Sequence, residues 1–176
     1  MTEENNVEEK TTRRNFIVKA ATAAAGVGVA VCTIPLIRSM WPDAGVIAAG
    51  STEVDLSNIK EGESITVMWQ GKPVFITHRT PEQIKEAQQV PLSDLKDPQP
   101  DSDRVQKGKE QWLVTIAVCT HLGCVPSLGK GDFGGSLCPC HGSQYDTSQR
   151  IRYGPAPKNL EVPSYVFLSD TRIKIG

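Results

Sequence analysis

Residues Cys119–Cys124 read CTHLGC, and residues Cys138–Ser143 read CPCHGS. Thirteen residues, 125–137, separate these two boxes, which together hold four of the five cysteines and two of the three histidines in the chain. Each box pairs a cysteine with a histidine, as Cys-x-His in the first and Cys-x-x-His in the second, and adds one further cysteine. The boxes therefore gather most of the metal-ligating side chains into two short loops.

Two cysteine thiolates and two histidine imidazoles are the ligand set of a Rieske [2Fe-2S] cluster, in which the cysteines bind one iron and the histidines bind the other. Two alternatives stay open. A structural zinc site also uses cysteine and histidine, although its usual spacing is C-x2–4-C with a second ligand pair well downstream. A dithiol oxidoreductase fits less well, because neither box places a C-x-x-C at the start of a helix.

The sequence around the boxes predicts a mainly antiparallel β domain, because short β-rich runs alternate with turn residues and no βαβ alternation or internal repeat is present. In this pattern Gln70–Pro73 form the turn of a hairpin. The predicted strands are 64–69, 74–78, 111–118, 143–145, 151–153, 165–169 and 172–175.

One short helix is predicted after the hairpin. Thr80 can cap its first turn, Pro81 suits the first helical position and Gln83 completes a capping box, and the helix ends before Pro91. The following segment, 97–110, is rich in proline and charge, and is predicted to be an exposed loop.

A long uncharged segment near the N-terminus predicts a membrane anchor over residues 16–38. The 18 residues Ala20–Ile37 carry no charge, and about 22 apolar residues at 1.5 Å each cover roughly 33 Å, enough to cross a bilayer. A cleaved signal peptide and a buried core helix are the alternatives. Four basic residues precede or begin the segment and one follows it, which predicts a cytoplasmic N-terminus: Lys10, Arg13, Arg14, Lys19 and Arg38.

The chain is predicted to have four parts. Residues 1–15 form a tail whose Arg13-Arg14 pair resembles a twin-arginine export signal, and 16–38 form the anchor. A linker containing proline, glycine and alanine follows at 39–51, and the globular head occupies 52–176, with a metal-binding part at about 112–157. The net charge of -1 gives no basic excess, which excludes a typical nucleic-acid-binding protein.

The two boxes, followed by Tyr145-Asp146, resemble those of the Rieske iron-sulfur subunits of ubiquinol-cytochrome c reductase. The resemblance covers nearly the whole chain, since the anchor, the linker and the segments 71–80 and 154–157 have counterparts in that family. It implies a Rieske-type antiparallel β-sheet head with a small cluster-binding subdomain and one short helix, attached to a single N-terminal transmembrane helix.

The resemblance also implies the ligands of one [2Fe-2S] cluster. Cys119 and Cys138 would bind the inner iron, and His121 and His141 would bind the outer iron. The remaining cysteine of each box would join the other in a disulfide, Cys124–Cys140. The third histidine, His78, is expected to be a surface or hydrogen-bonded residue because the cluster is already fully ligated.

Further residues near the boxes receive roles from the same resemblance. Ser143 would donate a hydrogen bond to a bridging sulfide, and Tyr145 would donate one to the thiolate of Cys119, which stabilises the reduced cluster. Leu122, Gly154 and Pro155 would supply the apolar surroundings of the cluster and the docking tip.

The implied function is quinol oxidation by a subunit of a proton-translocating quinol-cytochrome c oxidoreductase. His141 would meet the quinol in a pocket of cytochrome b, and the linker would let the head pass its electron to a membrane-bound cytochrome c subunit. The head would then lie on the periplasmic side of a bacterial inner membrane. Within the same class, the alternative is the Rieske subunit of another exported oxidoreductase, such as arsenite oxidase.

Overall fold

The computed structural model describes residues 13–42, 45 and 50–176, and the chain divides into two units, Met1–Val46 and Ile47–Gly176. Most of the predicted tail, residues 1–12, lies outside the described residues. The predicted linker at 39–51 also lies partly outside them, at 43, 44 and 46–49.

The first unit contains one long helix, α1 (Arg13–Ser39). It has 27 residues and no buried residue, and an 18-residue stretch within it has a mean hydropathy of 1.9. At 1.5 Å per residue it is about 40 Å long, and its backbone groups are hydrogen-bonded within the helix, so it meets the requirements of a membrane span. The helix includes the whole predicted anchor, 16–38.

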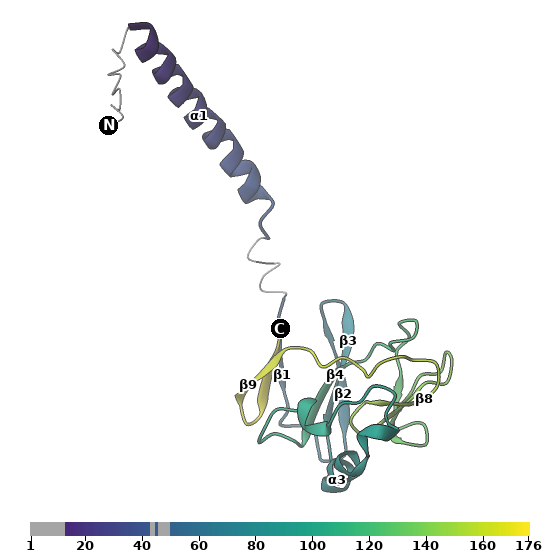
Figure 1. Ribbon diagram of the computed structural model, residues 1–176. Coiled ribbons are helices and arrows are strands. Elements are labelled where there is room, and N and C mark those ends of the chain that lie inside the picture. The colour runs from purple at the N-terminus through teal and green to yellow at the C-terminus, as the bar shows by residue number, and fades with distance from the viewer. Residues whose placement is uncertain (1–12, 43–44, 46–49) are drawn as a thin grey trace, which may run out of the picture. The chain divides into compact units, whose positions relative to one another are not determined.

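Two three-stranded antiparallel sheets form the base of the head (Figure 1). The first has the order β1 (Thr52–Asp55), β10 (Arg172–Ile175), β9 (Tyr165–Ser169), and the second has the order β2 (Ser64–Trp69), β3 (Lys72–His78), β4 (Trp112–Ile116). Val54 and Ile173 from the first sheet join Ile76 and Val114 from the second in one buried apolar cluster. Burial of this shared core holds the two sheets together.

A third antiparallel sheet carries the two boxes. Its strands are β5 (Ser127–Leu128), β6 (Gly134–Leu137), β7 (Gln144–Asp146) and β8 (Ile151–Tyr153), paired in that order. The first box lies between β4 and β5, and the second connects β6 to β7. This sheet has a separate buried cluster, made of Cys119, Cys138, Tyr145, Ile151, Ala156 and Leu160.

The predicted short helix is confirmed as α3 (Pro81–Gln89). The Thr80 hydroxyl accepts a hydrogen bond from the backbone N–H of Gln83 at 3.2 Å, and the Gln83 side chain accepts one from the backbone N–H of Thr80 at 3.0 Å. This reciprocal pair is the capping box that the sequence predicts. The helix ends before Pro91, also as predicted.

The hairpin between β2 and β3 is tighter than predicted. Its turn consists of Gln70 and Gly71, with φ of 48° and 74°, as a two-residue type I′ connection requires. β3 therefore begins at Lys72 rather than at 74. Pro73 pairs with Met68 as the second residue of the strand, near the strand start where proline is tolerated.

The segment 97–110 is not the exposed loop that its composition predicts. Asp101 and Arg104 are buried in it, with exposed fractions of 3% and 2%. The Arg79 guanidinium donates to the Asp101 carboxylate at 2.6 Å, and Arg104 donates to the backbone carbonyls of Ser148 and Leu160. Asp101 and Arg104 can be buried because Asp101 is paired with Arg79 and Arg104 donates to backbone carbonyls. Asp103 and Lys107 in the same segment are exposed, as predicted.

Candidate metal centre

Both boxes fold into the same kind of tight turn. The Gly123 N–H donates to the Cys119 carbonyl at 2.9 Å in the first box, and the Gly142 N–H donates to the Cys138 carbonyl at 3.0 Å in the second. Both glycines have positive φ, 81° and 75°, a conformation that glycine adopts without steric cost. The turns therefore present Cys119 and Cys138 at equivalent positions.

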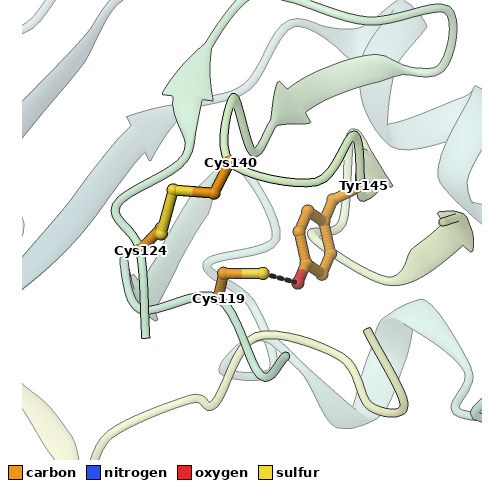
Figure 2. The surroundings of a disulfide bond; sticks show 4 residues. All are labelled: Cys119, Cys124, Cys140 and Tyr145. Atoms are coloured by element: carbon orange, nitrogen blue, oxygen red, sulfur yellow. Dashed lines mark hydrogen bonds between the residues drawn. A yellow bond between two sulfur atoms is a disulfide. The ribbon is translucent and has the colours of Figure 1, made fainter. Parts of the chain in front are cut away.

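A disulfide joins the two turns. The Sγ atoms of Cys124 and Cys140 are bonded at 2.06 Å, across a sequence separation of 16 residues (Figure 2). This is the pairing that the family resemblance implies. It fixes the spacing between the boxes and leaves one cysteine in each box as a free thiol.

The two free thiols are buried, each with an exposed fraction of 2%. Burial alone would raise the pKa of the Cys119 thiol, but hydrogen bonds from the Tyr145 hydroxyl and the His121 backbone amide lower it below its ordinary value. Burial raises the pKa of the Cys138 thiol. The surroundings of Cys119 thus favour the thiolate, which is the form that binds metal.

Tyr145 contacts the first of these thiols directly. Its hydroxyl donates to Cys119 Sγ at 3.2 Å (Figure 2), and the residue is fully buried. Burial raises the pKa of the Tyr145 hydroxyl well above its ordinary value, so the group keeps its proton and remains a donor. β7 places this side chain in the core of the third sheet.

The two box histidines lie side by side. Their ring centroids are 4.7 Å apart and the rings are nearly perpendicular, at 88°. His121 Nδ1 is buried and has no hydrogen-bond partner within the described residues, whereas His141 is exposed. A buried imidazole nitrogen without a partner is costly unless it binds something, so Nδ1 of His121 has the properties of a metal-ligand atom.

These donors fit the implied cluster. Two buried thiols and two adjacent imidazoles match a centre with two cysteine and two histidine ligands. A different group of three sulfur atoms, from Cys124, Cys138 and Cys140, lies within 4.8 Å of one another. Two of those atoms belong to the disulfide and cannot bind a metal as thiolates, so that group is not a complete ligand set.

The Gly154–Pro157 loop packs directly on the second box. A Cβ at Gly154 would lie 2.8 Å from the Ser143 amide nitrogen, so a side chain at that position would displace the box. The Ala156 N–H donates to the Ser143 hydroxyl oxygen at 3.1 Å, and Ala156 is fully buried. Leu122, in contrast, is 69% exposed at the surface of the first box.

Sequence reasoning missed several residues that support the centre. The Thr120 hydroxyl donates to the Lys158 carbonyl at 2.7 Å, which joins the first box to the end of the 154–157 loop. Lys96 contacts the same loop through the carbonyls of Gly154 and Ala156. Both contacts link segments far apart in the chain, and the only sequence signal was that Thr120 lies inside a box.

His78 is placed as expected for a residue outside the centre. Its Nδ1 lies 2.9 Å from the Ile59 carbonyl oxygen, and its ring stacks on Trp112 with centroids 4.1 Å apart. The prediction of a hydrogen-bonded histidine is therefore confirmed.

Comparison with protein families matches the two parts of the chain separately. A family described as the Rieske [2Fe-2S] domain matches residues 52–166. A second family, described as the "Ubiquitinol-cytochrome C reductase Fe-S subunit TAT signal", matches residues 3–43. The first match includes both boxes, and the second includes the arginine pair and the predicted anchor.

Similar proteins match over nearly the full length. The ubiquinol-cytochrome c reductase iron-sulfur subunit of Rickettsia felis is 58% identical over 174 residues, which are 98% of each chain. That of Bradyrhizobium diazoefficiens is 58% identical over 94% of each chain. Among solved structures, a chain of a hyperthermophilic respiratory complex III has a TM-score of 0.57 and 27% identity, covering 89% of this chain and 98% of that one.

Proposed function

Because the chain belongs to the Rieske iron-sulfur subunits of ubiquinol-cytochrome c reductase and carries one Rieske-type [2Fe-2S] cluster, we propose that the two boxes supply all four ligands. Cys119 and Cys138 bind one iron, and His121 and His141 bind the other. The two free thiols, the unpartnered Nδ1 of His121 and the neighbouring ring of His141 support this assignment.

Burial separates the two ends of the proposed centre. The thiols of Cys119 and Cys138 are inside the protein, whereas His141 is exposed. When bound, a Rieske cluster accepts one electron at a potential of roughly −150 to +300 mV. The exposed histidine end is therefore where a substrate can approach, and the buried thiolate end is protected from water.

We assign His141 to the contact with quinol. An exposed imidazole can accept the hydrogen bond of a quinol hydroxyl and then its proton, so it couples proton uptake to oxidation of the quinol. The exposed side chain of Leu122 and the ring of Pro155 offer an apolar surface around it for docking. Membership of the cytochrome bc complex makes cytochrome b the partner whose quinol pocket receives this tip.

The next electron acceptor in this proposal is the membrane-bound cytochrome c subunit. One cluster serves two partners if the head moves between them, and the proline, glycine and alanine content of the 39–51 linker suits that movement. The helix α1 holds the protein in the membrane as a single span. The excess of basic residues before the span supports a cytoplasmic N-terminus and a periplasmic head in the bacterial inner membrane.

The observation that carries the ligand assignment is the buried, unpartnered Nδ1 of His121 beside the exposed ring of His141. In the purified chain, His121→Ala and His141→Ala should each abolish the reduced-state electron paramagnetic resonance signal and lower the iron content. His78→Gln is the matched control, because His78 bonds to Ile59 and stacks on Trp112 away from the boxes.

The control variant should keep the signal and two irons per chain. A cluster signal that persists in His141→Ala would refute the ligand assignment. Zinc in place of iron in the wild-type protein would instead support the structural zinc alternative, which the family matches do not favour.

A further inference from the structure

The loop beside the second box is short of backbone donors. Residues 154–157 read Gly-Pro-Ala-Pro, and the two prolines have no N–H. The carbonyls of Gly154 and Ala156 each precede a proline, so the loop cannot pair its own groups as a strand does. It needs donors from elsewhere to be held in one conformation.

Lys96 supplies those donors. Its Nζ donates to the Gly154 carbonyl at 2.7 Å and to the Ala156 carbonyl at 3.2 Å. The ammonium group thus bridges the carbonyl groups on both sides of Pro155. Both bonds are charge-assisted, which makes them stronger than bonds from a neutral donor.

The neighbours of Lys96 fix its backbone, whereas its side chain reaches the loop from the surface. Leu95 is buried, with an exposed fraction of 5%. On the other side, the Asp97 carboxylate accepts the backbone N–H of Asn159 at 2.9 Å, and the Asp97 carbonyl accepts the Asn159 side-chain amide at 3.0 Å. Lys96 therefore holds the loop at Gly154 and Ala156, and Asp97 holds the chain just beyond the loop, at Asn159.

The held loop in turn orients the Ser143 hydroxyl. The Ala156 N–H donates to that hydroxyl oxygen at 3.1 Å, so the hydroxyl proton must point away from the loop. Ser143 is fully buried, and a hydrogen bond from its side chain lowers the pKa of the Cys119 thiol, so its proton points toward the two boxes. If Ala156 moved, the Ser143 hydroxyl would lose this hydrogen bond and with it the fixed direction of its proton.

We propose that Lys96 is a positioning residue for the redox centre: by bridging the Gly154 and Ala156 carbonyls it holds the Ser143 hydroxyl as a donor toward the cluster and raises the cluster's reduction potential. The inference rests on the proposed ligand assignment. A donor aimed at cluster sulfur stabilises the reduced, more negative form, and the fixed positive charge of Lys96 acts in the same direction.

The test compares Lys96→Met with a charge-matched control. Lys96→Met removes both hydrogen bonds and one positive charge. Lys158→Met removes the same charge beside the same loop, from an exposed side chain that makes no hydrogen bond within the described part of the chain. The readout is the midpoint potential of the full chain, followed through the cluster's electron paramagnetic resonance signal at low and high salt.

Lys96→Met should reduce the equilibrium constant for cluster reduction about three- to tenfold, which is about 28 to 59 mV for a one-electron couple. The decrease should persist at high salt, because screening removes a long-range charge effect and leaves the loss of a hydrogen bond. Lys96→Arg, which keeps the charge and two or more donors, should restore the potential. Hydrogen exchange at the Ala156 amide should accelerate in Lys96→Met alone.

Equal potentials in Lys96→Met and the wild type would overturn the proposal. It would also fail if Lys158→Met lowered the potential as much as Lys96→Met, because the effect would then be one of charge alone. If Lys96→Met assembles no cluster, Lys96→Ala applies the same criteria, because it also removes both hydrogen bonds and the charge. A wild-type chain without a high-potential cluster signal would instead refute the proposed function.

Discussion

At the scale of single residues, the contact between Tyr145 and Cys119 bears most directly on electron transfer. The hydroxyl lies 3.2 Å from Sγ in a fully buried site, where a hydrogen bond is electrostatically stronger than in water. Because the bond strengthens as negative charge accumulates on sulfur, it favours the reduced state of the centre. The pKa of the tyrosine, raised by burial, ensures that the donor stays protonated.

Replacing Tyr145 by Phe should therefore keep the cluster and lower its midpoint potential. Losing about 1 kcal/mol of preferential stabilisation corresponds to about 40 mV for one electron. Tyr153→Phe is the control. That tyrosine is 64% exposed, so this variant should not change the midpoint potential of the cluster. A redox titration measures the midpoint potential of both variants. An unchanged midpoint potential in Tyr145→Phe would show that the Tyr145–Cys119 bond does not distinguish the two oxidation states.

At the scale of elements, a buried ion pair joins the end of β3 to the segment before β4. Arg79 and Asp101 have side chains that are 0% and 1% exposed, and their Nη1 and Oδ1 atoms are 2.6 Å apart. Asp101 also accepts a hydrogen bond from Ser148, which lies just after β7. The pair therefore connects the base of the head with the sheet that carries the boxes.

Breaking this pair should destabilise the head strongly. Arg79→Met leaves the Asp101 carboxylate buried without its cation, and should lower the free energy of unfolding by about 3–5 kcal/mol. Lys109→Met removes the cation from the exposed Lys109–Asp170 pair, whose Asp170 side chain is 92% exposed, and should cause no measurable change. Denaturant unfolding of the full chain measures both, and equal stabilities would contradict a structural role for the buried pair.

Sequence reasoning succeeds for local motifs and fails for the segment before β4. The boxes, the anchor, α3 and most of the longer strands are local patterns, so the chain predicts them from adjacent residues. The burial of Asp101 and Arg104 depends on partners more than 20 residues away, and composition alone makes such charges look exposed. β1, β5 and β6 were likewise missed; β1 has only four residues, β5 has two, and β6 begins with two glycines.

The functional site likewise contains some residues that the sequence predicts and others that it does not. The ligand candidates lie within two short motifs and were visible in the sequence, as was Tyr145 through its family resemblance. Lys96 was not, because it reaches the 154–157 loop from 58 residues away in the chain. A lysine in a polar, proline-rich segment carries no local sign that its ammonium group will bridge two carbonyls.

At the scale of the whole molecule, the chain must place an anchor in the membrane and the redox head on the correct side of it. Two features at the start of α1 bear on this: the positive charge of the N-terminal flank and the adjacent pair Arg13-Arg14. The charge acts through the positive-inside rule, whereas a twin-arginine signal is an address read by an export receptor. The match of residues 3–43 to a TAT-signal family supports the second role.

Replacing both Arg13 and Arg14 by Lys separates these roles, because it keeps every positive charge and removes the arginine pair. We expect the double variant to retain its head in the cytoplasm, while Arg38→Lys, the same chemical change at the other end of α1, leaves export unchanged. Protease added to spheroplasts should digest the head of the wild type and of Arg38→Lys but not that of the double variant. Digestion of all three would show that charge alone directs export, and protection of the wild-type head would reverse the proposed orientation.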